Sequence, residues 1–165
     1  MSTEENQNFP TYQDSNSTEY PQNEKEVSSC IKKFYKSNIP IELLGSGSKK
    51  KIGRLIQCAR TLSLSKLEGI IEYLPEELYI KAKAGTSIKK IEEELKKNKQ
   101  QLAFEPIDFG YLLNGKSNYG TAAGHVACNI SGPRRLKVGS VRDHVLGVRG
   151  VNGRGEIIKS GGIVV

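Results

Sequence analysis

Two segments of the chain, residues 24–38 and residues 88–98, carry apolar side chains at the spacing of an amphipathic helix. A polar residue able to cap the first turn precedes each pattern, Asn23 in the first segment and Thr86 or Ser87 in the second. The repeating apolar positions are Val27, Cys30, Ile31 and Phe34 in the first segment and Ile88, Ile91 and Leu95 in the second. The pattern therefore predicts two helices, each with one buried face.

Short apolar or alternating runs predict strands between and after these helices. Single strands are expected at residues 39–44, 55–58, 61–64 and 101–104, and hairpins at 69–73 with 78–84 and at 145–151 with 156–160. The connecting segments are expected to be a long loop over 105–118, a tight turn or short helix over 120–128, and a loop over 131–139. This order of elements predicts an α+β domain.

The composition fits one globular domain: of 165 residues, 36% are hydrophobic and 26% are charged. Residues 1–23 are mostly polar, so we expect a flexible N-terminal arm there and the folded domain over residues 24–165. No apolar run approaches the roughly 20 residues that span a bilayer, so we expect no transmembrane segment. Three cysteines (Cys30, Cys58 and Cys128) without CxxC spacing predict reduced thiols in a cytoplasmic setting and no metal site.

Positive charge is concentrated near the C-terminal end of the sequence. The net charge is +7, yet residues 1–30 hold one lysine and six acidic residues, whereas residues 110–165 hold eight basic and two acidic residues. The basic segment is also rich in glycine between Gly120 and Gly162, which predicts an anionic ligand close to the backbone. Nucleic acid is not expected, because the sequence has no recognisable binding motif and no Trp.

A second candidate site follows the predicted strand 39–44, where the sequence reads Gly45-Ser46-Gly47-Ser48 and then three lysines. It is not a Walker A loop, because no Gly-Lys-Ser/Thr closes it, and it is not a dinucleotide fingerprint, because Lys50 replaces the third glycine. On these residues alone, a flexible loop is a commoner explanation than a phosphate cradle. The lysines fit a solvated run as well as they fit a phosphate site.

The motifs GSGS, AGTSIKKIEEEL, QLAFEP and SGPRRLKVGSVRDHVLGVRGVNGRGE occur in a familiar order. Through these motifs the chain resembles the PCMH-type FAD-binding domain of the vanillyl-alcohol oxidase flavoprotein group, and the resemblance covers about residues 20–162. Within that group it is most similar to the FAD-binding subunits of glycolate oxidases (GlcE-type). The resemblance implies a PCMH-type FAD-binding fold in which two small α+β subdomains, about 24–73 and 78–162, clasp FAD. It also implies a substrate domain that this chain lacks.

The resemblance implies which residues border FAD. The loop after the first strand would hold the pyrophosphate, and the later glycine-rich segments would follow the ribityl chain, the flavin ring and the adenine side. The residues that match are Leu44, Gly45, Ser46, Gly47, Ser48, Gly120, Thr121, Ala122, Ala123, Gly124, Asn129, Ser131, Gly132, Gly139, Val141, Arg142, Asp143 and Ile157. The first loop has no His, and no Cys precedes Gly120 in its segment, so FAD is expected to bind noncovalently. For His125 a structural role or a ring contact is favoured over a general base.

The function implied by the resemblance is an FAD-binding subunit, or a fragment of one, of a 2-hydroxy-acid oxidase or dehydrogenase of the glycolate type. The catalytic residues are not identifiable from the sequence. The implied partners are the other subunits of a glycolate-oxidase-like complex and a small 2-hydroxy-acid substrate. We expect a cytoplasmic protein that its partners bring to the inner membrane. The alternative is a non-catalytic FAD-binding or complex-assembly module.

Overall fold

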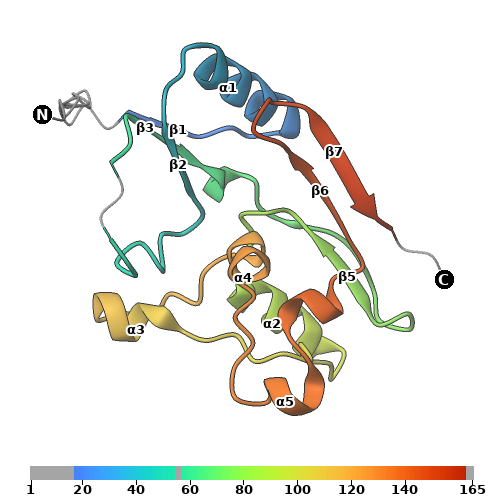
Figure 1. The fold of residues 1–165 in the computed structure, drawn as a ribbon. Helices are drawn as coiled ribbons and strands as arrows, with labels where there is room; N and C mark the ends of the chain where they lie inside the picture. The colour runs from blue at the N-terminus through green and yellow to red at the C-terminus, as the bar shows by residue number, and fades with distance from the viewer. Residues whose placement is uncertain (1–16, 55–56, 163–165) are drawn as a thin grey trace, which may run out of the picture.

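The computed structural model describes residues 17–54 and 57–162. Figure 1 shows two groups of elements: α1, the β1–β3 sheet and the β6–β7 hairpin lie at one end, and helices α2 to α5 lie at the other. The loop that follows β2 reaches from the first group toward α3 and α4. Helices and strands are mixed as expected for the predicted α+β fold class.

The first group is built on helix α1 (Glu24–Lys36) and a three-stranded parallel sheet. Asn23 caps α1, because its side chain accepts a hydrogen bond from the backbone N–H of Glu26. The sheet has the order β1 (Thr18–Glu19), β3 (Arg60–Ser63), β2 (Ile41–Leu44). Leu62 of β3 is fully buried and packs with Val27 and Ile31 of α1, which fixes the helix on the sheet.

The second group begins with the antiparallel hairpin of β4 (Ile70–Leu74) and β5 (Tyr79–Ala82). Helix α2 (Ile88–Lys97) follows, capped by Ser87, and buries Ile88, Ile91 and Leu95 against this hairpin. Tyr119 and Ala122 pack on the same cluster, so α2 is also the support for the start of α4.

The remaining elements are short. They are the 3₁₀ turns η1 (Leu64–Lys66) and η2 (Val141–His144), the helices α3 (Phe109–Asn114), α4 (Ala122–Cys128) and α5 (Arg135–Val138), and the strands β6 (Gly147–Val151) and β7 (Ile157–Gly161). The β6–β7 hairpin packs on α1. Arg149 donates two hydrogen bonds to Glu24, at 2.6 and 2.9 Å, and the buried Ser28 hydroxyl donates to the Gly155 carbonyl at 2.5 Å. These bonds join the hairpin near the C-terminal end of the sequence to helix α1.

Several predicted elements are corrected by the structure. Residues 101–104 form no strand; instead Leu102 packs on the α2 cluster as an irregular segment. The expected loop 105–118 contains α3, which Asp108 caps by accepting from Gly110 N, and the expected loop 131–139 contains α5. Thr18–Glu19, placed in the flexible arm, pair with β3. The strand expected at 55–58 begins on residues outside the described ranges, and its described part, 57–58, is not a strand.

Candidate functional site

The loop after β2 lies against the segment that leads into α4, although more than 70 residues separate them in the sequence. Asn118 joins the two. Its Oδ1 accepts from Ser46 Oγ at 2.9 Å and from Gly120 N at 3.1 Å, and its Nδ2 donates to the Ser46 carbonyl at 3.3 Å. The structure therefore brings together Gly45–Ser48 and Gly120–Gly124, the two stretches that sequence analysis assigned to opposite parts of the cofactor.

The start of α4 is held by the backbone of the segment before α2. Ile88 N donates to the Gly120 carbonyl at 3.1 Å, and Ala122 N donates to the Thr86 carbonyl at 2.8 Å. Thr121 then caps α4, because its Oγ1 accepts from Gly124 N at 3.3 Å. These bonds fix the position of Gly120–Gly124 relative to the α2 core.

Two glycines allow the loop and the α4 segment to approach each other. A Cβ atom at Gly45 would stand 2.6 Å from Thr121 Oγ1, which is closer than real Cβ contacts. Gly120 has a φ of +88°, and a Cβ there would stand 2.8 Å from Ser48 Oγ and 3.2 Å from Lys49 Nζ. Both positions are thus explained by packing between protein segments, in addition to any role toward a ligand.

Positive charge is held at this junction by Lys49. Its ammonium lies 3.3 Å from Ser48 Oγ and 5.9 Å from the centre of the Phe109 ring, and in the described ranges no carboxylate pairs with it. Burial lowers the pKa of Lys49. A half-buried ammonium without a carboxylate is a favourable position for an anionic ligand.

His125 of α4 lies beside this ammonium and is fully buried. Its Nδ1 lies 3.3 Å from the Thr121 carbonyl oxygen, which only accepts, so Nδ1 carries the proton. In the described part of the chain, Nε2 is the buried side-chain polar atom without a hydrogen-bond partner. Burial, and after it the charge of Lys49, lower the pKa of His125.

A third set of predicted residues is organised around η2. The buried Ser131 hydroxyl accepts from Val141 N at 2.9 Å, and Asn129 Oδ1 accepts from Arg142 N at 3.0 Å. Asp143 accepts from Ser140 N at 2.7 Å, and this bond contributes most to lowering the pKa of Asp143. These bonds connect the end of α4 with η2.

Other predicted residues are placed differently. A Cβ at Gly132 would stand 2.6 Å from Glu105 Cβ, and one at Gly139 would stand 3.1 Å from Asp143 Oδ2, so both glycines permit local packing. Ile157 lies half exposed in β7, opposite Val151, in the hairpin that packs on α1. Leu44 ends β2 directly before the Gly45–Ser48 loop.

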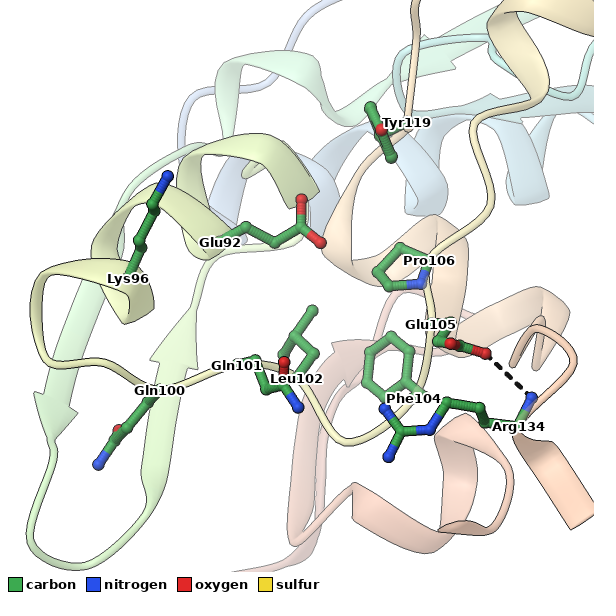
Figure 2. Close-up of a pocket in the computed structure, with 10 residues that line it drawn as sticks. All are labelled: Glu92, Lys96, Gln100, Gln101, Leu102, Phe104, Glu105, Pro106, Tyr119 and Arg134. Atoms are coloured by element: carbon green, nitrogen blue, oxygen red, sulfur yellow. Dashed lines mark hydrogen bonds between the residues drawn. The ribbon is translucent and has the colours of Figure 1, made fainter. Parts of the chain in front are cut away.

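An open hollow of about 480 Å³ lies between α2, residues 100–106 and Arg134 (Figure 2). Glu105 forms part of its wall and accepts a hydrogen bond from Arg134 N at 2.9 Å. None of the predicted site residues lines this hollow. Two residues that do line it, Tyr119 and Arg134, lie close in the sequence to predicted site residues. Its mixed carboxylate, amide and cationic lining has no chemistry that singles out one ligand.

The junction of the loop and α4 fits the phosphate part of FAD. The buried Ser48 hydroxyl and the Lys49 ammonium are suitable phosphate ligands, and the unpartnered His125 Nε2 marks a polar position left open by the protein. From the sequence, Lys49 fitted a solvated run as well as a phosphate site, and for His125 a structural role or a ring contact was favoured over a general base. Asn118 was not identified as a site residue. The signal for His125 in the sequence was its place next to Gly124, in a segment expected to border the cofactor.

The fold of the chain matches the folds of parts of larger solved structures. Solved structures that match it include an alkyldihydroxyacetonephosphate synthase, with a TM-score of 0.64 and 18% identity over 88% of this chain and 26% of that one. Phl p 4.0202, a glucose dehydrogenase, has a TM-score of 0.68 and 11% identity over 87% of this chain and 28% of that one. At these identities the likeness establishes the fold alone.

The family model "FAD binding domain" matches residues 18–161, and the chain belongs to this family. Its cofactor is FAD. The chain is 40% identical over 126 residues to glycolate oxidase subunit GlcE of Escherichia coli (strain K12), which covers 76% of this chain and 34% of that protein. It is 29% identical over 145 residues to D-lactate dehydrogenase of Anaerostipes hadrus, covering 85% and 28%. The chain thus spans about a third of the length of these relatives.

Proposed function

We propose that this chain is the FAD-binding part of an oxidoreductase that acts on a small 2-hydroxy acid. The observation that carries the proposal is the 40% identity with a glycolate oxidase subunit, supported by the match to a D-lactate dehydrogenase. Glycolate and D-lactate are both 2-hydroxy acids, so the shared chemistry is oxidation of the carbon that bears the hydroxyl. When bound, FAD supplies the acceptor for the hydride that leaves this carbon.

In this proposal the chain binds and orients the cofactor noncovalently. The loop 45–48 and Lys49 hold the pyrophosphate, and the segments 120–124 and 129–132 lie along the rest of the cofactor. Residues 139–143 and Ile157 complete the border. The hydrogen bonds of Asn118, which fix the loop against the α4 segment, would keep the phosphate groups and the flavin at a constant separation.

The proposal includes partner subunits, because the relative with 40% identity is itself a subunit of an oxidase. The partners would form a glycolate-oxidase-like complex in the cytoplasm and would be the means of any contact with the inner membrane. Within the described ranges, no helix has the length and apolarity to cross a bilayer.

Purification of the tagged chain from its native host, with its partners bound, tests the activity. We expect flavin in the complex and reduction of an artificial dye that depends on glycolate or D-lactate. Acetate, which lacks the hydroxyl group, is the control and should give no reduction. A complex that retains flavin but does not reduce the dye when any 2-hydroxy acid is added would contradict the proposed activity while leaving FAD binding intact.

A further inference from the structure

The β4–β5 turn (residues 74–78) exposes apolar and acidic side chains together. Leu74 and Leu78 are 37% and 79% exposed, and Glu76 and Glu77 between them are exposed as well. In the described ranges, neither carboxylate forms a salt bridge. Leu78 also has a φ of +57°, a conformation that glycine would adopt at lower cost. The fold of one chain therefore does not account for a large, exposed apolar residue at this position.

The α5 tip (residues 134–137) exposes the opposite charge in the same kind of arrangement. Leu136 is 100% exposed, and Arg134, Arg135 and Lys137 around it are exposed too. None of these three cations pairs with a carboxylate in the part of the chain that the structure describes. The segment is held by its own backbone, because Lys137 N donates to the Arg134 carbonyl at 2.8 Å. The α5 tip is thus an ordered basic projection around one leucine.

These two surfaces lie on either side of the open hollow between α2 and residues 100–106. Gln100 lines one side of the hollow and holds the β4–β5 turn, since its Nε2 donates to the Pro75 carbonyl at 2.8 Å. Arg134 lines the other side, where its backbone N donates to Glu105 at 2.9 Å (Figure 2). One face of the molecule therefore has an acidic end, a hollow and a basic end, and each end carries an exposed leucine.

A face with this distribution of charge is complementary to a second copy of itself. A two-fold axis through the hollow places the basic end of one copy on the acidic end of the other, and the same contact then forms twice. A partner of a single charge, such as an acidic protein or an anionic membrane, would be repelled by one of the two ends. The net charge of +7 makes two copies repel each other elsewhere, so a contact between opposite charges favours this one orientation.

We propose that this face joins two copies of the chain in a two-fold dimer, with the α5 tip of each copy on the β4–β5 turn of the other. Leu136 and Leu78 supply the apolar surface that each contact buries, and Arg135 and Glu77 supply an ion pair beside it. Arginine suits such a contact, because its guanidinium can donate two parallel hydrogen bonds to a carboxylate. None of these residues is expected to border FAD, so the inference does not depend on the proposed function.

Analytical ultracentrifugation of the full chain over a range of protein concentrations tests the dimer. We expect the mass to rise from the 18.2 kDa of one chain to twice that value, and to fall again when added salt screens the charges. Leu136→Asp removes the central apolar contact on both sides of the axis and should raise the dimer dissociation constant by about tenfold or more. Leu112→Asp, at an exposed leucine of α3, is the matched control and should leave this constant unchanged.

Charge reversal tests the reciprocal pairing of the two ends. Arg135→Glu alone and Glu77→Arg alone each create two like-charge contacts in the dimer and should weaken it by about tenfold or more. An equal mixture of the two variants should dimerise as the wild-type chain does, because both contacts in the mixed pair again join opposite charges. Arg154→Glu, at an exposed position of the β6–β7 turn, is the charge-matched control. Circular dichroism should be the same for all variants, because every substituted side chain is exposed.

Several outcomes would overturn the inference. A wild-type chain that stays monomeric at the highest soluble concentration excludes the dimer, and a dimer that Leu136→Asp leaves unchanged lies on another face. A mixture of Arg135→Glu and Glu77→Arg that stays monomeric, or that forms assemblies larger than a dimer, contradicts the two-fold arrangement. If the wild-type chain is a monomer alone and uses the α5 tip only to bind a different subunit, a second copy is the wrong partner. FAD binding is measured separately and is unaffected by each of these results.

Discussion

Replacement of Gly45 by alanine tests whether the loop and the α4 segment pack as described. The φ of Gly45 is not positive, so alanine would ordinarily raise the free energy of unfolding by about 0.4–1 kcal/mol, through the entropy of the unfolded chain. Here the new Cβ would stand 2.6 Å from Thr121 Oγ1 and 3.3 Å from Thr121 Cγ2. Overpacking of this kind costs about 1–3 kcal/mol. The clash outweighs the entropic gain, and we expect Gly45→Ala to lower the free energy of unfolding by about 1–2 kcal/mol.

A double-mutant cycle with Thr121→Ala makes this prediction specific. Thr121→Ala removes both clashing atoms and the α4 cap, which alone costs about 1 kcal/mol. In that background Gly45→Ala should be neutral or stabilising, so urea unfolding should give a coupling of about 1–2 kcal/mol between the two sites. Gly153→Ala, where a Cβ meets no atom within 4 Å, is the control. Equal effects of Gly45→Ala in both backgrounds would refute the described contact.

Four further predictions address the core, the hairpin, pH and the cofactor. Leu62→Ala should lower the free energy of unfolding by about 2–5 kcal/mol in urea titrations, because Leu62 is fully buried; a loss below 1 kcal/mol would contradict its place in the core. Ser28→Ala should cost about 1 kcal/mol and speed amide exchange in β6, since the buried hydroxyl no longer reaches the β6–β7 turn; unchanged exchange would argue against this link. Because the pKa of folded His125 is depressed, the stability of the FAD-free chain should be complete above about pH 6.5 and fall at lower pH as the unfolded chain takes up the proton, a slope that His125→Gln should reduce. Gly124→Val should reduce the amount of FAD that stays with the protein on gel filtration, whereas Gly153→Val should leave that amount unchanged. Equal FAD retention by both variants would contradict the proposed position of FAD beside Gly124.

The two longer helices were predictable from sequence because their information is local. Apolar residues repeat through several turns of α1 and α2, and Asn23 and Ser87 cap them as expected. Helix α3 is only six residues long, so no apolar period can develop, and its end depends on the αL conformation of Gly115. Residues 101–104 look like a strand because Leu102 is apolar, but its burial comes from packing on α2 rather than from pairing.

The candidate site was predictable only in part: its glycine segments were indicated, whereas the contacts between them were not. Resemblance to a flavoprotein family indicated which glycine segments border FAD, and the structure brings two of these segments together. The gathering of Ser48, Lys49 and His125 around Gly120 was not predictable, because Lys49 and His125 lie 76 positions apart in the sequence. A lysine in a polar run and a lone histidine carry no local sign of that contact. The same holds for Asn118, whose hydrogen bonds to the loop exist only in the folded chain.

Equilibrium binding of FAD to the purified full chain tests the central claim most directly. The chain should be freed of flavin, incubated with excess FAD, passed over a gel-filtration column and examined for flavin absorbance in the protein peak. We predict close to one FAD per chain, released intact by acid because it is bound noncovalently. A folded chain, verified by circular dichroism, that elutes without flavin after this treatment would contradict the account.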